Sequence, residues 1–304
     1  MLASRVVPTR PRRKVRLTLT AAGKVNLALE VLGKRADGYH ELVTVMQTID
    51  LADRLVLEEA DDLVLTTTSP EVPADGGNLV LRAAAALRAA AKVDRGVHVR
   101  LDKRIPVAAG LGGGSSDAAA VLLGLNRLWA LRWPVARLAD IAVTLGMDVP
   151  FFLRGGVAMG TGRGEELSPL QGMPMALVLV NPGEALSTAA VYGRVTPAMY
   201  SDGTRARTTA EALQTRRPSR VAASLYNSLE AAASGVQPDL VRMRAALLAA
   251  GALGAVMSGS GPTVFGVARS FEQARQIRAR LARASWGCWA VRTVSGPAVR
   301  IRAA

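Results

Sequence analysis

A cluster of glycines stands directly before a predicted helix in the first half of the chain. The stretch PVAAGLGGGSSDAAA holds four glycines within five residues, followed by two serines and an aspartate. A helix begins with about four backbone N–H groups that lack partners inside it, and with the positive end of its dipole. Glycines before it let further N–H groups point into the same space and let an anion approach the backbone closely. The stretch predicts a phosphate-binding loop, with a tight strand–helix connection as the plainer alternative.

We predict that this phosphate-binding loop consists of Pro106, Val107, Ala108, Ala109, Gly110, Leu111, Gly112, Gly113, Gly114, Ser115 and Ser116. Either serine can cap the helix or offer its hydroxyl to a phosphate or to the accompanying metal. A side chain added at Gly113 is expected to occupy the space of the phosphate. The loop is not a P-loop, since no lysine follows the glycines. It also departs from the dinucleotide pattern, as does the second cluster, GTGRGEE at 160–166.

Other polar residues of interest have plain structural interpretations when taken alone. Lys24 is typical of a solvated strand end, and Asp148, in GMDVP, is typical of a helix cap or turn. Tyr39 and His40 follow an Asp-Gly turn signal and suit loop packing, while His98 alternates within a predicted strand and is interpreted as structural. No His, Cys, Asp and Glu cluster has metal-ligand spacing.

The elements that must position these residues are a mixture of strands and helices. Alternating residues at 16–33 predict a strand, a bend and a second strand. Apolar and alanine-rich stretches predict helices at 78–93 and 117–131, and the polar, arginine-rich segment 200–220 is expected to form a surface loop. Strands and helices do not alternate regularly, which favours an α+β fold of two parts with a boundary near residues 150–160.

Length and composition narrow the class of protein further. The chain has 304 residues, half of them hydrophobic, and a formal net charge of +14. Residues 1–16 hold six cationic residues and no acidic ones, and we expect a flexible basic tail there. Only 4% of residues are aromatic, which disfavours nucleic-acid binding. The longest glycine-and-apolar run, 245–257, is shorter than the ~18 residues of a membrane span. A single cysteine and no signal-peptide pattern indicate a cytoplasmic protein without membrane partners.

Three motifs, in order, resemble those of the GHMP family of small-molecule kinases. The glycine loop is similar to the family's ATP-binding motif. AAGKVNLALEVLGKRADGYHELVTVMQTIDLAD resembles its N-terminal motif, and GAVMSGSGPTVFG its C-terminal glycine loop. The resemblance covers roughly residues 20–270. It implies a two-domain fold, with a ribosomal-S5-like domain over 17–158, a ferredoxin-like domain over 159–304 and the active site in the cleft between them.

The resemblance also implies an activity and a catalytic pair. Lys24 and Asp148 match the family's catalytic lysine and aspartate, in which the carboxylate orients a hydroxyl and takes its proton. The lysine ammonium keeps that carboxylate ionised and stabilises developing negative charge. The expected co-substrate is ATP with Mg²⁺, which phosphates and waters would hold together with the hydroxyl of Ser116.

Within the family, GYHEL and LGMDVPFF resemble the branch that phosphorylates the 2-hydroxyl of 4-diphosphocytidyl-2-C-methyl-D-erythritol in the non-mevalonate isoprenoid route. Tyr39 would then stack on the cytosine and His40 contact it, with Asn26 and Thr188 as further substrate contacts. Gly259 and Gly261 would belong to an active-site loop. Arg163 suits a phosphate ligand and an ordinary ion pair equally. The alternatives are a kinase for homoserine or a mevalonate-like alcohol and a non-catalytic nucleotide-binding protein; the oligomeric state is left open.

Overall fold

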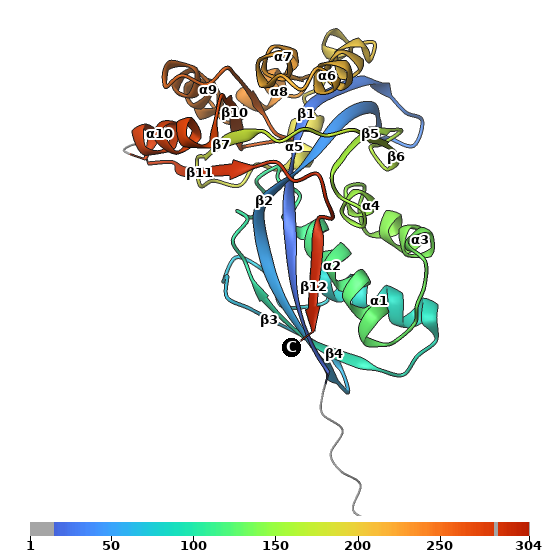
Figure 1. The fold of residues 1–304 in the computed structure, drawn as a ribbon. Helices are drawn as coiled ribbons and strands as arrows, with labels where there is room; N and C mark the ends of the chain where they lie inside the picture. The colour runs from blue at the N-terminus through green and yellow to red at the C-terminus, as the bar shows by residue number, and fades with distance from the viewer. Residues whose placement is uncertain (1–14, 283–284, 304) are drawn as a thin grey trace, which may run out of the picture.

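The chain forms two α/β parts joined by two very long strands, in a computed structural model that describes residues 15–282 and 285–303 (Figure 1). Most of the predicted basic tail, residues 1–14, lies outside the described residues. Arg16, which we counted with the tail, already begins the first strand and pairs with Glu58. No helix among the described residues is long and apolar enough to cross a membrane.

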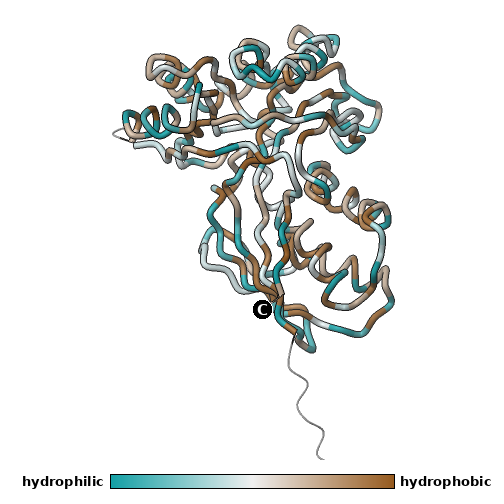
Figure 2. Tube along the Cα trace, viewed as in Figure 1, coloured by the Kyte–Doolittle hydropathy of each residue, from teal (hydrophilic) through white to brown (hydrophobic). Residues whose placement is uncertain are grey.

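The N-terminal part is a sheet with helices packed on one face (Figure 1). Its strand order is β12-β1-β2-β4-β3. The bounds are β1 Arg16–Lys34, β2 His40–Ala60, β3 Leu63–Thr67, β4 Gly96–Asp102, β12 Val299–Ala303, α1 Leu79–Ala91, α2 Gly113–Leu128, α3 Val135–Leu145 and α4 Val149–Phe152. Leu17, Leu19, Leu55 and Leu57 alternate along β1 and β2 and are fully buried beneath α2. This alternation of period two explains why one sheet face is covered, and Figure 2 shows hydrophobic (brown) and hydrophilic (teal) residues interspersed along the strand traces.

The C-terminal part contains a second sheet, with order β11-β7-β10-β9. Its strands are β7 Ala176–Asn181, β9 Gly254–Met257, β10 Val264–Ala268 and β11 Gly287–Arg292, with α9 Asp239–Ala249 and α10 Phe271–Leu281 between them. This β-α-β-β-α-β arrangement is the ferredoxin-like topology that we expected. The remaining elements are β5 Val157–Thr161, β6 Glu166–Leu170, α5 Thr188–Tyr192, η1 Pro197–Met199, α6 Thr204–Gln214, α7 Pro218–Ser224, β8 Tyr226–Asn227 and α8 Glu230–Ser234.

The predicted bend near Lys24 is absent. Residues 16–34 form one continuous strand, and Lys24 lies inside it rather than at a strand end. The irregularity that the glycine signalled is a β-bulge, because the pairing register with β2 shifts between Ala22 and Lys24. The shift spans one residue of β1, Gly23, and three of β2, residues 49–51, so the extra residues lie on β2 and β1 continues through Lys24.

The prediction of a surface loop over residues 200–220 is wrong, because most of that segment forms α6 and α7. Its polar composition conceals a narrow buried stripe, in which Ala206, Thr209 and Leu213 face the interior at helical spacing. The N-terminal turn of α6 is fixed by the buried carboxylate of Glu30 on β1, which accepts a hydrogen bond from the Ala206 N–H at 2.6 Å. Carboxylates stabilise helix N-termini through these free N–H groups.

The division into 17–158 and 159–304 remains a prediction. A boundary between residues 158 and 159 falls within β5, which pairs with both β2 and β6. After β11 the chain returns to the N-terminal sheet, where β12 pairs with β1. The N-terminal sheet therefore contains strands from both ends of the chain.

Candidate active site

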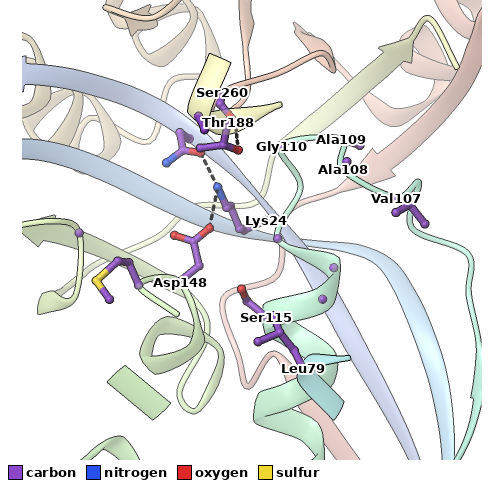
Figure 3. Close-up of a pocket in the computed structure, with 18 of the residues that line it drawn as sticks. Lys24, Leu79, Val107, Ala108, Ala109, Gly110, Ser115, Asp148, Thr188 and Ser260 are labelled. Atoms are coloured by element: carbon purple, nitrogen blue, oxygen red, sulfur yellow. Dashed lines mark hydrogen bonds and ion pairs between the residues drawn. The ribbon is translucent and has the colours of Figure 1, made fainter. Parts of the chain in front are cut away.

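A cavity of about 1090 Å³ lies where the two parts meet. A typical ligand pocket has a volume of roughly 300–1,000 Å³, so this one lies just above the upper end of that range. Most of the predicted site residues line it: Lys24, Asn26, Tyr39, His40, Asp148, Thr188, Gly259 and the loop residues 106–110 and 112–115. Figure 3 shows Lys24 pointing toward Asp148, with Thr188 and Ser260 to one side and the start of α2 to the other.

Two hydrogen bonds fasten the glycine loop and the start of α2 to β1, on either side of Gly23. The Lys24 N–H donates to the Leu111 carbonyl at 2.9 Å, and the Ser116 hydroxyl donates to the Ala22 carbonyl at 2.7 Å. A Cβ at Gly23 would lie 3.2 Å from the Leu111 oxygen, so glycine keeps this approach open. Leu111 and Ser116 therefore face the interior and do not line the cavity, which leaves Ser115 as the serine exposed to a ligand.

The turn into α2 lines the cavity, and the first N–H groups of this helix have no hydrogen-bond partner within residues 15–282 and 285–303. Gly110 and Gly112 both have positive φ, of 73° and 70°, and Gly112 precedes the helix without a side-chain cap. Gly113 has no positive φ, and a Cβ there would point 3.0 Å from the Lys103 ammonium and 3.1 Å from Ile105. Our expectation for Gly113 is thus wrong, because a side chain would strike the protein beneath the loop. A Cβ at Gly114 meets only Leu79, at 3.7 Å.

Lys24 and Asp148 come together although 124 positions separate them. The Lys24 ammonium lies 3.2 Å from an Asp148 carboxylate oxygen, and the two side chains are 4% and 35% exposed. The same ammonium donates to Asn26 Oδ1 at 2.7 Å, and Asn26 Nδ2 donates in turn to the Thr44 hydroxyl at 2.8 Å. This relay holds a buried cation in one orientation beside a carboxylate that remains open to the cavity, a geometry suited to moving a proton from a bound hydroxyl.

Aromatic and basic side chains form the far end of the cavity. Tyr39 is 53% exposed, and the Arg163 guanidinium lies over its ring at 5.1 Å. Arg163 is paired with Glu165 at 2.9 Å, which supports the ion-pair interpretation of this residue. The His40 ring lies 5.2 Å from that of Tyr192, which also lines the cavity and which the sequence did not single out. Burial, followed by the charge of Lys34, lowers the pKa of His40, which favours the neutral imidazole.

The predicted C-terminal glycine loop supplies one wall. Gly259 and Ser260 line the cavity, and the Ser260 hydroxyl lies 2.8 Å from that of Thr188. Gly261 does not line it; a Cβ there would contact Met257 and Leu186. His98 also lies away from this cavity, where it contacts Thr66 at 3.1 Å on the sheet.

The sequence did not lead us to predict a buried cluster of charged side chains beneath the glycine loop. Lys103 contacts Asp53 at 2.5 Å and Asp117 at 2.9 Å. Asp53 also accepts the backbone N–H groups of Arg104 and Ile105, whereas Asp117 Oδ1 has no partner among the described residues. Asp53 is therefore the better stabilised anion. Burial, with the charge of Asp53 adding to it, raises the pKa of Asp117 to about 8. Lys103 could have indicated this cluster in the sequence, because it is one of only five lysines and stands three residues before the loop.

This cluster should make stability depend on pH. The folded protein holds a proton on Asp117 up to about pH 8, while the unfolded chain releases it near pH 4. Because the native state binds more protons over that range, its contribution to the free energy of unfolding falls as pH rises. A pKa unit corresponds to about 1.4 kcal/mol. Measured by urea unfolding, the free energy of unfolding of Asp117→Asn relative to that of the wild type should therefore rise by a few kcal/mol from pH 5 to pH 9. Asp140→Asn, an exposed α3 site, is the control; equal pH profiles for all three proteins would refute the shift.

Among residues 15–282 and 285–303, no group of three or more His, Cys, Asp or Glu side chains is placed to hold a metal ion. The oxygen available near the turn into α2 is the Ser115 hydroxyl. A cation in this cavity would therefore need most of its ligands from a bound phosphate compound and from water, which is how Mg²⁺ commonly binds with nucleotides.

Comparison with known proteins agrees with this geometry. The model of the GHMP kinases N-terminal domain matches residues 78–156, and that of the GHMP kinases C-terminal domain matches residues 209–287. The chain belongs to the GHMP kinase family, and its fold is the two-domain fold of these small-molecule kinases.

Within the family, the chain is similar to 4-diphosphocytidyl-2-C-methyl-D-erythritol kinases. It is 46% identical to the enzyme of Pelotomaculum thermopropionicum over 88% of this chain and 94% of the relative. It is 47% identical to that of Moorella thermoacetica over 87% and 94%. A crystal structure of 4-(cytidine 5'-diphospho)-2C-methyl-D-erythritol kinase, 40% identical, superimposes with a TM-score of 0.80 over 92% of this chain and all of the other.

A more distant structure shares the fold alone. Homoserine kinase from Cytophaga hutchinsonii is 18% identical, with a TM-score of 0.73 over 97% of this chain and all of the other. At this distance the likeness supports the architecture and carries no information on the substrate.

Proposed function

We propose that this protein is an ATP-dependent kinase that phosphorylates the 2-hydroxyl of 4-diphosphocytidyl-2-C-methyl-D-erythritol. The observation that carries the proposal is the Lys24–Asp148 pair, held at 3.2 Å in the same cavity as the glycine loop. Relatives that are 41–47% identical over most of the chain and bear the name of this kinase support the choice of substrate.

The Lys24–Asp148 pair would act on the attacking hydroxyl. The Asp148 carboxylate orients the alcohol toward the terminal phosphate and accepts its proton as the new O–P bond forms. Lys24 stabilises the negative charge that develops on the transferring phosphoryl group. Phosphoryl transfer has a loose transition state, so alignment and electrostatics are expected to supply most of the rate. The hydrogen bond from Lys24 to Asn26 contributes to that alignment by fixing the ammonium.

The glycine loop would hold the ATP phosphates through its backbone. The free N–H groups around Gly112–Ser115 face the cavity, and Asn78 and Leu79 line it beyond the loop, where an adenosine would extend. Mg²⁺ fits this site as a companion of ATP. It would be held by phosphate oxygens, waters and the Ser115 hydroxyl, and when bound it neutralises phosphate charge. We had assigned Ser116 to this role, but its hydroxyl is donated to Ala22 inside the fold.

The aromatic end of the cavity would take the cytidine. Tyr39 offers an open ring face for a pyrimidine, and His40 and Tyr192 form the adjoining wall. Lys34 lines the same cavity and would supply positive charge for a diphosphate. Homoserine and mevalonate-like alcohols carry no base to stack here, and a passive nucleotide-binding protein has no use for the Lys24–Asp148 pair. A cytoplasmic location without nucleic-acid or membrane partners remains a prediction.

The proposal is tested by coupling ADP release to a panel of alcohols with and without a cytidine diphosphate group. Turnover should require both ATP and the cytidyl compound. Turnover of homoserine or mevalonate instead would assign another branch of the family, and ATP binding without turnover of any alcohol would favour a non-catalytic role.

Replacing Tyr39 should separate the two substrates. A base–aromatic stack contributes ~1–3 kcal/mol, so Tyr39→Ala should raise KM for the cytidyl substrate by about tenfold to a hundredfold. KM for ATP should stay within about twofold, because the glycine loop lies at the other end of the cavity. Tyr39→Phe keeps the ring and serves as the matched variant with near wild-type KM. If both KM values rise together in Tyr39→Ala, this ring supports the fold rather than the base.

A further inference from the structure

The segment 258–261, which we call the β9 loop, approaches the Lys24–Asp148 pair closely. A Cβ at Gly259 would lie 3.4 Å from the Lys24 ammonium and 3.4 Å from Asn26 Oδ1. The backbone of this loop therefore forms the wall directly beside the two polar atoms that orient the cation. A displacement of about one ångström would alter the geometry available to a bound phosphate, and rates respond steeply to such misplacement.

Ser258 connects the β9 loop to two other parts of the site. Its hydroxyl donates to the Gly110 carbonyl at 2.9 Å and accepts the backbone N–H of Asn26 at 3.3 Å. The residue is fully buried. One hydroxyl thus joins three segments: the β9 loop, the glycine loop and the strand that carries Lys24. The contact is tight, since a Cβ at Gly110 would lie 2.2 Å from the Ser258 carbonyl oxygen.

Asn227 holds the backbone on both sides of Ser258. Its Nδ2 donates to the Met257 and Gly259 carbonyls, both at 2.8 Å, and its Oδ1 accepts the Leu229 N–H at 2.9 Å. Both N–H donors of this buried amide and its carbonyl oxygen have a partner, as burial requires. Asn227 does not line the cavity, and it is itself fixed to β1 through the parallel pairing of β8 with that strand.

We propose that Asn227 is a positioning residue of the kinase. It clamps the two carbonyls that flank Ser258, and through Ser258 it sets the glycine loop and the β9 loop against the strand bearing Lys24. The reaction-rate part of this inference depends on the proposed function, whereas the coupling between Asn227 and the glycine loop does not. The Asn227 side chain lies outside the cavity and bonds only the Met257 and Gly259 carbonyls and the Leu229 N–H among the described residues, so its amide acts on the glycine loop through the backbone around Ser258.

The test compares Asn227→Asp, Ser258→Ala and the double variant. Asp keeps the acceptor for Leu229 but turns an oxygen toward two carbonyl oxygens, which should displace the β9 loop. We expect each single variant to lower kcat by about tenfold or more, while KM for ATP stays within about threefold. Because both act through one contact, the double variant should be little worse than the worse single one. Amide hydrogen exchange across residues 106–116 should become about tenfold faster in each.

Asn126→Asp is the matched control. Asn126 also bonds a backbone carbonyl and N–H, both of Trp133, but at the opposite end of α2. It should lose thermal stability while keeping wild-type kcat and wild-type exchange over 106–116. Asn227→Asp behaving in the same way would overturn the positioning role. If Asn227→Asp does not fold, Asn227→Ala, which removes the clamp without repulsion, is judged by the same criteria. A wild-type protein inactive on the cytidyl alcohol would refute the proposed function, and the exchange measurement would still decide the clamp.

Discussion

Asp148→Asn is expected to lower kcat for the cytidyl alcohol by roughly a hundredfold or more. The substitution keeps the size of the side chain but removes its charge and its capacity to accept a proton, and losses of this size are typical of a positioned acid–base group. KM for ATP should change far less, because in the proposed function backbone N–H groups of the glycine loop would hold the phosphates while Asp148 would act on the acceptor hydroxyl. Steady-state kinetics with each substrate varied in turn would measure both constants.

Lys24→Met should cause a loss of similar size. Methionine keeps the length of the buried stem, which packs beside Gly112, and removes only the ammonium that contacts Asp148 and Asn26. Since the two residues act as a unit, the double variant should be little worse than the worse single one. Asp140→Asn, on the exposed side of α3, should retain full activity. An Asp148→Asn enzyme near the wild-type rate would remove the pair from the chemistry.

Motif order in the sequence predicted many of the residues that line the cavity, but not which of their atoms face it. Lys24, Asp148 and the glycine loop were predicted from motif order, and the structure places the first two 3.2 Å apart. What the motif could not give is which atoms face the ligand. Ser115 and Ser116 are adjacent and chemically identical, yet only Ser116 donates its hydroxyl to the Ala22 carbonyl, whereas Ser115 lines the cavity. That choice depends on a contact between β1 and the start of α2 across 94 positions of sequence, which no local pattern encodes.

The fold was predicted well where periodicity is strong and poorly where composition hides it. The alternating leucines of β1 and β2 and the alanine-rich α1 and α2 were found, whereas α6 was mistaken for a loop because only a thin stripe of it is apolar. Long-range polar contacts were the other gap. Asp53, Lys103 and Asp117 stand 14–64 positions apart in sequence, and Asn227 bonds the β9 loop at Gly259 from 32 positions away. Nothing in a single sequence marks such pairs before the strands are assembled.

Gly112→Ala should nearly abolish activity, with kcat/KM lower by about a hundredfold or more. Gly112 has φ of 70°, which an alanine adopts only with strain, and its Cβ would lie 2.7 Å from the Phe152 ring and 3.2 Å from Lys24 Cε. The ring is fully buried and has no room to withdraw, so the turn or Lys24 must move. Both the start of α2 and the Lys24–Asp148 pair would then be displaced. Thermal denaturation should show a lower Tm beside the kinetic loss.

Gly114→Ala distinguishes distortion of the protein from a block to ATP binding at the backbone. Its added Cβ meets only Leu79, at an ordinary 3.7 Å, and alanine favours the helix by about 0.5–1 kcal/mol, so Tm should rise. If the ATP phosphates lie against this turn, the new methyl group stands between them and the backbone donors. The affinity for ATP should then fall by about tenfold in calorimetry although the free protein is more stable. A Gly114→Ala protein that binds ATP as tightly as the wild type would place the phosphates elsewhere in the cavity, and the loss in Gly112→Ala would then come from the displaced Lys24 alone.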